Sequence, residues 1–188
     1  MKRTATLFLF LILFTATSFS QNRSLQIGGR LMNELTLYDG LAPGFGAQLV
    51  YRITKHGGIE TGLYYQSRKV NYFIEAQNGG TSVTYTAQVA ERRLQLPLLY
   101  RFDSKLLNFV VGTSLDYFLG WKEKSDNGDI KIISYDRDAL SVAVSAGISK
   151  SIYLTPTLIL EPEAKFNLIV TDDDGGLGLN LGLRKIIF

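Results

Sequence analysis

Hydrophobic and polar residues alternate along most of this 188-residue chain, with a period of two instead of the 3.6 of an amphipathic helix. Residues 140–149 show the pattern: leucine, valine, alanine and isoleucine occupy even positions, while serine, alanine and glycine occupy odd ones. Glycine, proline, asparagine and aspartate separate the alternating segments, as expected for turns. The pattern predicts eight strands, at residues 25–36, 43–54, 58–74, 84–102, 107–121, 139–151, 157–169 and 177–188.

The connections between the predicted strands differ in length between the two ends of the sheet. Short connections are predicted at 54–58, 103–106 and 153–157; longer polar ones are predicted at 75–83 and 122–137, with 38–42 and 171–176 at the same end. Short turns at one end and longer loops at the other are typical of outer-membrane barrels.

Two kinds of barrel fit such strands, and the polar face distinguishes them. A soluble, lipocalin-like barrel turns its apolar face inward, whereas a membrane barrel turns it outward to lipid. Among many small residues, the polar positions carry Arg30, Arg52, Arg68, Arg93, Arg101, Lys165, Arg184, Glu34, Glu60, Glu91, Asp116, Glu161 and Glu163. This near balance of charge indicates a narrow, filled interior, where buried charges need partners. The sequence therefore predicts an all-β, eight-stranded antiparallel up-and-down transmembrane β-barrel, located in the cell outer membrane and in contact with outer-membrane lipids.

The aromatic residues of the apolar face fall into two groups. Phe45, Tyr65, Tyr117, Trp121 and Phe166 are predicted near the outer rim, and Tyr51, Tyr100, Phe102 and Phe109 near the inner rim. Aromatic residues favour strands in general, but that preference does not explain two tiers. Girdles of this kind mark the two lipid–water boundaries of a membrane barrel.

Four cations interrupt the apolar face. Lys69 and Arg92 lie near the tip of the hairpin formed by the third and fourth strands, which we expect to rise beyond the bilayer. Lys150 and Lys185 lie near the inner rim, where a long side chain reaches water. The last strand also changes phase, and a β-bulge near Arg184–Lys185 would restore its register.

The first 20 residues have the layout of a secretory signal. Lys2 and Arg3 precede the apolar run TLFLFLILF, and small residues including Ser18 and Ser20 follow it. The run is too short to span a bilayer comfortably as a helix, and a retained membrane anchor is the alternative. We expect residues 1–20 to be cleaved as a signal peptide, which leaves residues 21–188 as one outer-membrane β-barrel domain.

Composition narrows the class further. The chain has no cysteine, so it has no lipid-anchoring cysteine, no disulfide framework and no thiolate metal site. The formal net charge of +3 is too small to argue for nucleic acid, and no nucleic-acid partner is expected.

Few residues offer catalytic chemistry. A lipid-modifying enzyme on such a barrel would need a histidine–serine pair near the outer rim, but the one histidine, His56, falls in a predicted inner-rim turn. Glu161 and Glu163 could form an acid–base pair, yet the neighbouring arginines favour a structural ion network. The segment TDDDGG (171–176) lacks the spaced ligands of a calcium loop. The sequence predicts no catalytic residue, no cofactor and no metal site, and therefore no enzyme.

The segment ERRLQLPLLYRF (91–102) resembles a strand of a known family. Its Leu94, Leu96, Pro97, Leu98, Leu99, Arg101 and Phe102 are similar to a motif of the small outer-membrane β-barrels of Bacteroidota, which include the PorT-like proteins. The last strand, with Phe188, resembles the closing strand of that family. The resemblance implies an eight-stranded outer-membrane barrel with a C-terminal strand read by the barrel assembly machinery, and most relatives have no established activity.

Three functions are compatible with these observations. The first is a non-enzymatic barrel with a filled polar interior, which has a structural role or binds an envelope protein partner through its outer loops. The second is an accessory component of a secretion or envelope-assembly complex, as the PorT-like resemblance implies. The third, an outer-membrane lipid-modifying enzyme, is disfavoured by the position of His56. A diffusion pore is not expected, because side chains fill the interior of an eight-stranded barrel.

Overall fold

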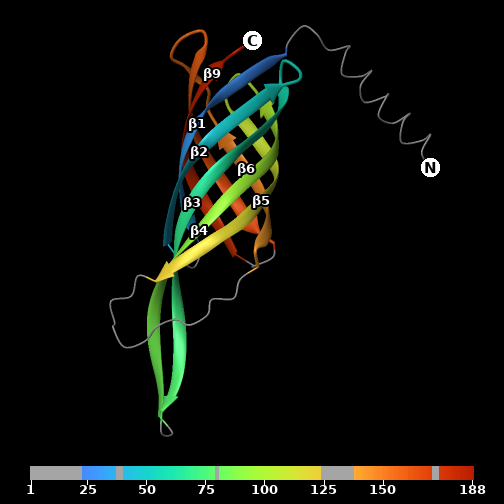
Figure 1. The fold of residues 1–188 in the computed structure, drawn as a ribbon. Coiled ribbons are helices and arrows are strands. Elements are labelled where there is room, and N and C mark those ends of the chain that lie inside the picture. The colour runs from blue at the N-terminus through green and yellow to red at the C-terminus, as the bar shows by residue number, and fades with distance from the viewer. Residues whose placement is uncertain (1–22, 37–39, 79–80, 124–137, 171–173) are drawn as a thin grey trace, which may run out of the picture.

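The computed structural model describes residues 23–36, 40–78, 81–123, 138–170 and 174–188, which form a closed antiparallel barrel (Figure 1). The strands are β1 (Ser24–Thr36), β2 (Gly40–Arg52), β3 (Gly57–Asn78), β4 (Thr81–Asp103), β5 (Asn108–Glu123), β6 (Leu140–Ser149), β7 (Ile152–Tyr153), β8 (Leu158–Ile169) and β9 (Asp174–Ile186). No helix in this described part is long and apolar enough to cross a membrane. The predicted signal peptide lies outside the described residues.

Eight long strands close the barrel, and this confirms the predicted fold class. Consecutive strands pair from β1 to β6, β6 pairs with β8, β8 with β9, and β9 returns to β1. The sequence did not predict the two-residue strand β7, which pairs with the start of β8. Pro162 lies between the two ladders of β8; it has no N–H to donate, and its carbonyl accepts from the amide of Lys150 (3.1 Å).

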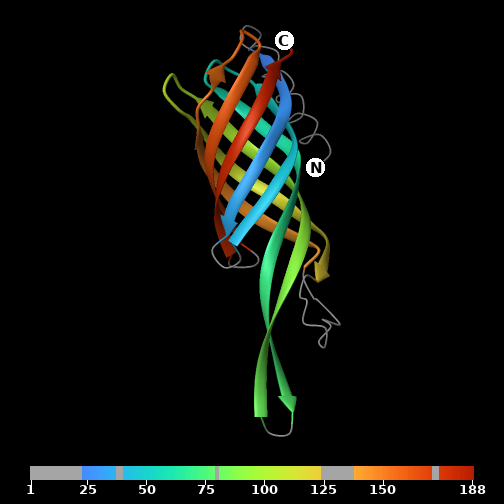
Figure 2. The ribbon, with the colours of Figure 1, turned by 90° about the vertical axis from the view of Figure 1, so that its left-hand side faces the viewer.

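The hairpin of β3 and β4 extends far beyond the rim of the barrel, at the end opposite to the short turns (Figures 1 and 2). The prediction of a loop at residues 75–83 was wrong, because the ladder continues to Asn78 and Thr81. Alternation persists through this segment, and the ladder reaches almost to the Gly79–Gly80 pair. Of the other long connections, residues 37–39, 124–137 and 171–173 lie outside the described residues.

The apolar face of the barrel points outward, as predicted. Exposed large hydrophobic side chains include Leu31, Leu63, Leu98, Val111, Val144, Leu168, Leu179 and Leu181. Most of the aromatic residues follow the same parity: Phe45, Tyr117 and Phe166 are exposed, as are Tyr100, Phe102 and Phe109 near the short turns. The prediction for Trp121 was wrong, because it pairs with the inward Glu91. A soluble barrel with its apolar face inside is therefore excluded, and a surface of this kind fits lipid.

The register of β9 is continuous, so the predicted bulge near Arg184–Lys185 was wrong. Arg184 pairs with Gly28 and Lys185 with Ile27, without an extra residue. Ile186, where the parity of the apolar residues changes, still pairs with Gln26 at an inward position, and Ile187 and Phe188 follow the end of the strand.

The barrel has an irregularity elsewhere. Arg92 pairs with Gly120 and Arg93 with Phe118, which leaves one extra residue, Leu119, on β5. Gly120 has a φ of 132°, a conformation that favours glycine. The β3–β4 ladder also skips Pro97, whose carbonyl accepts from the Thr61 hydroxyl (2.7 Å).

Candidate functional site

Six charged side chains from five strands meet inside the short-turn half of the barrel. They are Arg30 on β1, Glu60 on β3, Arg101 on β4, Glu161 and Glu163 on β8, and Arg184 on β9. We call them the ion-pair core. Each residue is at most 4% exposed, so solvent outside the barrel does not reach the charges. Alternation places them there because they share the inward parity of strands whose other face is apolar.

Glu161 is the centre of the ion-pair core. Arg101 donates to both of its carboxylate oxygens, through Nη1 to Oε1 (2.9 Å) and through Nη2 to Oε2. Arg184 also donates to Oε2, and Nη2 of Arg30 lies 3.5 Å from Oε1. One carboxylate thus contacts three guanidinium groups. Such charge-assisted hydrogen bonds are strong, but the loss of one partner would leave a buried charge without compensation.

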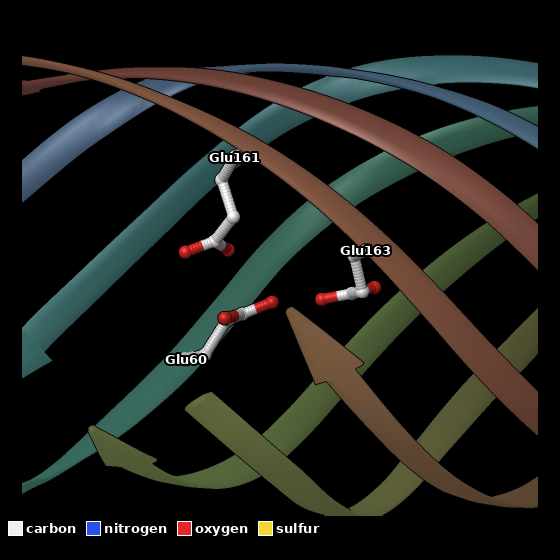
Figure 3. Close-up of side chains that lie close together, drawn as sticks. All are labelled: Glu60, Glu161 and Glu163. Atoms are coloured by element: carbon white, nitrogen blue, oxygen red, sulfur yellow. The ribbon is translucent and has the colours of Figure 1, made fainter. Parts of the chain in front are cut away.

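Arg30 joins the remaining two carboxylates. Its Nη2 lies 2.9 Å from Oε1 of Glu60, and its Nη1 donates to Oε1 of Glu163 (3.1 Å). Glu60 also accepts from Nη1 of Arg101 (3.0 Å), and Glu163 accepts from Nδ2 of Asn180 (2.8 Å). Figure 3 shows the carboxylates of Glu60, Glu161 and Glu163 directed toward one another inside the barrel. Three cations and three anions therefore share one closed network.

The ion-pair core crosses the lumen. Strand β3 is separated from β8 by three strands in either direction, so the two strands form opposite walls of the barrel. Arg101 contacts Glu60 on one of these walls and Glu161 on the other. Because the bridging groups are buried and bonded to each other, the core fills the cross-section with paired charge.

Tyr64 supports Arg30 from the barrel wall. Its ring centroid lies 5.9 Å from the guanidinium carbon of Arg30, a cation–π distance. The ring lies against Gly46 and Gly62: a Cβ on Gly46 would come within 2.6 Å of the Tyr64 ring, and one on Gly62 within 2.7 Å of its hydroxyl. The two glycines therefore leave room for Tyr64, and Tyr64 in turn holds Arg30 toward the carboxylates.

Asp103 extends the network to the short-turn rim. Its Oδ1 accepts from Nε of Arg101 (2.7 Å), and its Oδ2 lies 2.7 Å from Nη2 of Arg52. The sequence analysis did not single out Asp103, Tyr64 or Asn180. Parity could have found them, because Asp103 follows Arg101 by two residues and Tyr64 follows Glu60 by four.

All the other predicted interior charges also face inward. Glu91 accepts from Nη2 of Arg93 (2.8 Å) and lies 3.6 Å from Nε of Arg68. Glu34 accepts from the amide of Gln66 (3.1 Å), and Asp116 accepts from the hydroxyl of Ser114 (3.2 Å). Lys165 is 1% exposed, and no described residue bonds to its ammonium group.

The candidate catalytic and metal-binding residues are placed as follows. Glu60, Glu161 and Glu163 offer oxygens within 4.8 Å of one another, but arginines already bind each carboxylate, so the geometry is that of an ion-pair network. His56 lies exposed in the turn between β2 and β3, as predicted; its Nδ1 lies 2.9 Å from the carbonyl oxygen of Asp103. Residues 171–173 of the acidic segment lie outside the described residues.

A closed antiparallel barrel with an apolar outer face and paired charges inside is a transmembrane β-barrel of the outer-membrane type. Comparison with solved structures agrees with this fold: OprG, an outer-membrane protein of Pseudomonas aeruginosa, matches with a TM-score of 0.58 and 10% identity, over 88% of this chain and 96% of that one. Neisserial surface protein A matches with a TM-score of 0.46 and 16% identity, over 87% and 96% of the two chains. Ail of Yersinia pestis matches with a TM-score of 0.45 and 11% identity, over 88% and 97%.

No protein-family model matches the sequence, and no curated protein matches it. The resemblance to the PorT-like proteins stays a prediction.

Proposed function

We propose that this protein is a non-enzymatic, non-conducting barrel of the outer membrane that binds an envelope partner through its projecting hairpin. The observation that carries the first half is the ion-pair core, since Arg101 contacts carboxylates on opposite walls. A solute would have to separate several buried ion pairs to pass, and separating one such pair costs several kcal/mol, about 3–5.

Solute uptake by vesicles tests the absence of a pore. The purified protein is reconstituted into liposomes, and swelling is followed in isotonic solutions of small sugars, alongside single-channel recording in planar bilayers. We expect no swelling above that of empty liposomes and no steady conductance. Sugar uptake that scales with the amount of folded protein would overturn the proposal.

The hairpin carries the second half of the proposal. Inside the barrel, inward positions of β3 are polar, as at Gln66 and Arg68. Beyond the rim, the same parity is apolar: the ladder pairs Tyr72 with Ala87, Ile74 with Tyr85 and Ala76 with Val83. Positions paired across an antiparallel ladder share a face. The sequence and the register therefore place apolar residues at one parity of the ribbon beyond the rim, and an apolar set of this kind favours a protein partner.

Shortening the hairpin tests this half. Residues 71–88 are replaced by an Asn-Gly turn that joins Val70 to Val89, a pair already opposite in the ladder. The shortened barrel should still fold, while crosslinks to an envelope partner in intact cells should be lost. Retention of the same crosslinked partner would show that the hairpin does not bind it.

A role as an accessory component of a secretion or envelope-assembly complex is the second candidate, because of the strand motif around Pro97. Deletion of the gene should then abolish secretion. Recovery of secretion with the full chain, but not with the chain that has the shortened hairpin, would favour this role.

Delivery to the outer membrane belongs to the same proposal. We propose that residues 1–20 are a cleaved secretory signal and that the barrel assembly machinery recognises β9, whose outward positions from Leu177 to Leu183 are leucines. N-terminal sequencing of the membrane-bound protein tests the first point, and site-specific photocrosslinking from Leu179 during assembly tests the second.

A further inference from the structure

A shallow hollow lies on the outer, apolar surface of the barrel, across β8, β9, β1 and β2. It has a volume of about 510 Å³, and its lining includes Gly29, Leu31, Phe45, Leu160, Leu181 and Leu183. That volume lies within the range of small-molecule sites, roughly 300–1,000 Å³. The hollow lies near the middle of β1, since Gly29 is the sixth of its 13 residues, and on β8 it reaches Leu160, the third residue of that strand.

The strand register explains why the surface recedes here. One row of outward positions runs through Leu160, Leu183, Gly29, Ala47 and Leu63. Glycine and alanine therefore lie side by side between leucines. The next row toward the long loops carries bulky side chains again, with Leu181, Leu31 and Phe45 in sequence around the wall. The result is a hollow whose outward-facing lining side chains are all apolar.

Lys185 lies outside the lining of the hollow, on the β9 side toward the short turns. It follows Leu183 by two residues on the same face of β9, and it pairs with Ile27 and Leu158. It is exposed, and no described residue forms a hydrogen bond or ion pair with it. The exposed charged side chains at this end of the described chain are Lys55, Lys105, Lys150 and Lys185, with no exposed aspartate or glutamate among them.

A second hollow provides a contrast. It has a volume of about 330 Å³, lies on β6, β8 and β9, and also borders a lysine, Lys150. The ammonium group of Lys150 donates to the backbone carbonyls of Lys105 (3.2 Å) and Leu106, so it is already bonded. Only the first of these two hollows combines an apolar dent with an unbonded cation.

We propose that the hollow around Gly29 binds one acyl chain of an anionic phospholipid of the inner leaflet, and that Lys185 binds the phosphate. The proposal rests on placing the barrel in the outer membrane with its short turns toward the periplasm. The inner leaflet then meets the end of the barrel where exposed charge is entirely cationic. A basic residue near a membrane surface attracts anionic lipid. One such residue raises the affinity for an anionic lipid by about five-fold.

Two variants separate the acyl and phosphate contributions. Lys185→Gln removes the cation, and Gly29→Leu fills the dent; a Cβ at Gly29 has 3.7 Å to its nearest neighbour, so the backbone tolerates it. The matched controls are Lys105→Gln, in the turn between β4 and β5, and Ala146→Leu, an exposed outward position on β6.

Native mass spectrometry of the folded, detergent-solubilised protein measures the binding of phosphatidylglycerol and of phosphatidylcholine with identical chains. We expect the parent to retain more phosphatidylglycerol, Lys185→Gln to lower its binding about five-fold without changing phosphatidylcholine, and Gly29→Leu to weaken both lipids. The controls should match the parent. Equal binding of both lipids by the parent, or losses no larger than those of the controls, would overturn the proposal. Insertion into vesicles and mobility of unheated samples on gels are read separately, so a failure of membrane placement is distinguished from a failure of lipid selection.

Discussion

Removing the charge of Glu161 should destabilise the barrel more than removing the charge of either other carboxylate of the ion-pair core. Glu161→Gln keeps the shape of the side chain but takes the anion from between Arg101, Arg184 and Arg30. Arg184, which bonds to no other described side chain, then has no carboxylate partner. Because the site is buried, the surplus cation is not hydrated by bulk water, and we expect a loss of about 3–5 kcal/mol in the free energy of unfolding.

Glu163→Gln is the internal comparison. Glu163 contacts Arg30 (3.1 Å) and Asn180 (2.8 Å), and without its charge Arg30 still lies 2.9 Å from Glu60. The expected loss is therefore that of one charged hydrogen bond, about 1.5–3 kcal/mol. The order of the two variants follows from the number of arginines that each carboxylate serves.

Urea unfolding in lipid vesicles measures both losses, with the fluorescence of Trp121, the one tryptophan, and the gel mobility of unheated samples as independent signals. Lys69→Gln, at an exposed position near the base of the hairpin, is the control and should stay within about 0.5 kcal/mol of the parent. A loss below about 0.5 kcal/mol for Glu161→Gln, or a larger loss for Glu163→Gln, would refute the reasoning. Among described side chains Arg184 bonds only to Glu161, so Arg184→Met combined with Glu161→Gln should cost less than the sum of the two single changes.

Three further predictions concern Lys165 and Gly46 on the inner face and Thr61 on the outer face. Lys165→Met should leave the free energy of unfolding unchanged or raise it, because this buried ammonium has no described partner; a loss above about 1 kcal/mol would show that it is paired. Gly46→Ala should destabilise by about 1–3 kcal/mol, since its Cβ would lie 2.1 Å from a backbone oxygen, whereas Gly29→Ala should be neutral. Thr61→Val should cost about 0.5–1.5 kcal/mol by removing the hydrogen bond to Pro97, measured by the same unfolding curves.

The sequence was sufficient to predict the strands and their two faces, because alternation can be seen within one strand and does not depend on which strands pair with it. Every charged residue assigned to the interior, from Arg30 to Arg184, faces inward in the structure. The contacts among them could not be predicted in the same way. Whether Arg101 meets Glu60, Glu161 or both depends on strand tilt and stagger, which set the heights of residues on opposite walls.

The errors were also local in origin. A loop was predicted at 75–83 because the segment contains two glycines, an asparagine and a serine. In the structure β3 and β4 continue through most of this segment, in agreement with its alternating apolar residues. The bulge was placed at Arg184–Lys185 because the apolar residues change parity there, but the register continues unbroken to Ile186, an apolar residue at an inward position opposite Gln26. The bulge at Arg92 and Arg93 has no clear signal in the sequence apart from Gly120.

Closure of the barrel by β1 and β9 gives the ion-pair core a role during assembly. Arg184 and Glu161 lie on the neighbouring strands β9 and β8, but Arg30 on β1 meets Glu161 and Glu163 only after the first and last strands have paired. A slip of one residue in that pairing would turn one strand over, and its arginine would face lipid, where a charge near the bilayer midplane costs about 2–4 kcal/mol. The buried charges therefore select the correct register as the barrel closes, and a core without them would permit misregistered barrels to persist.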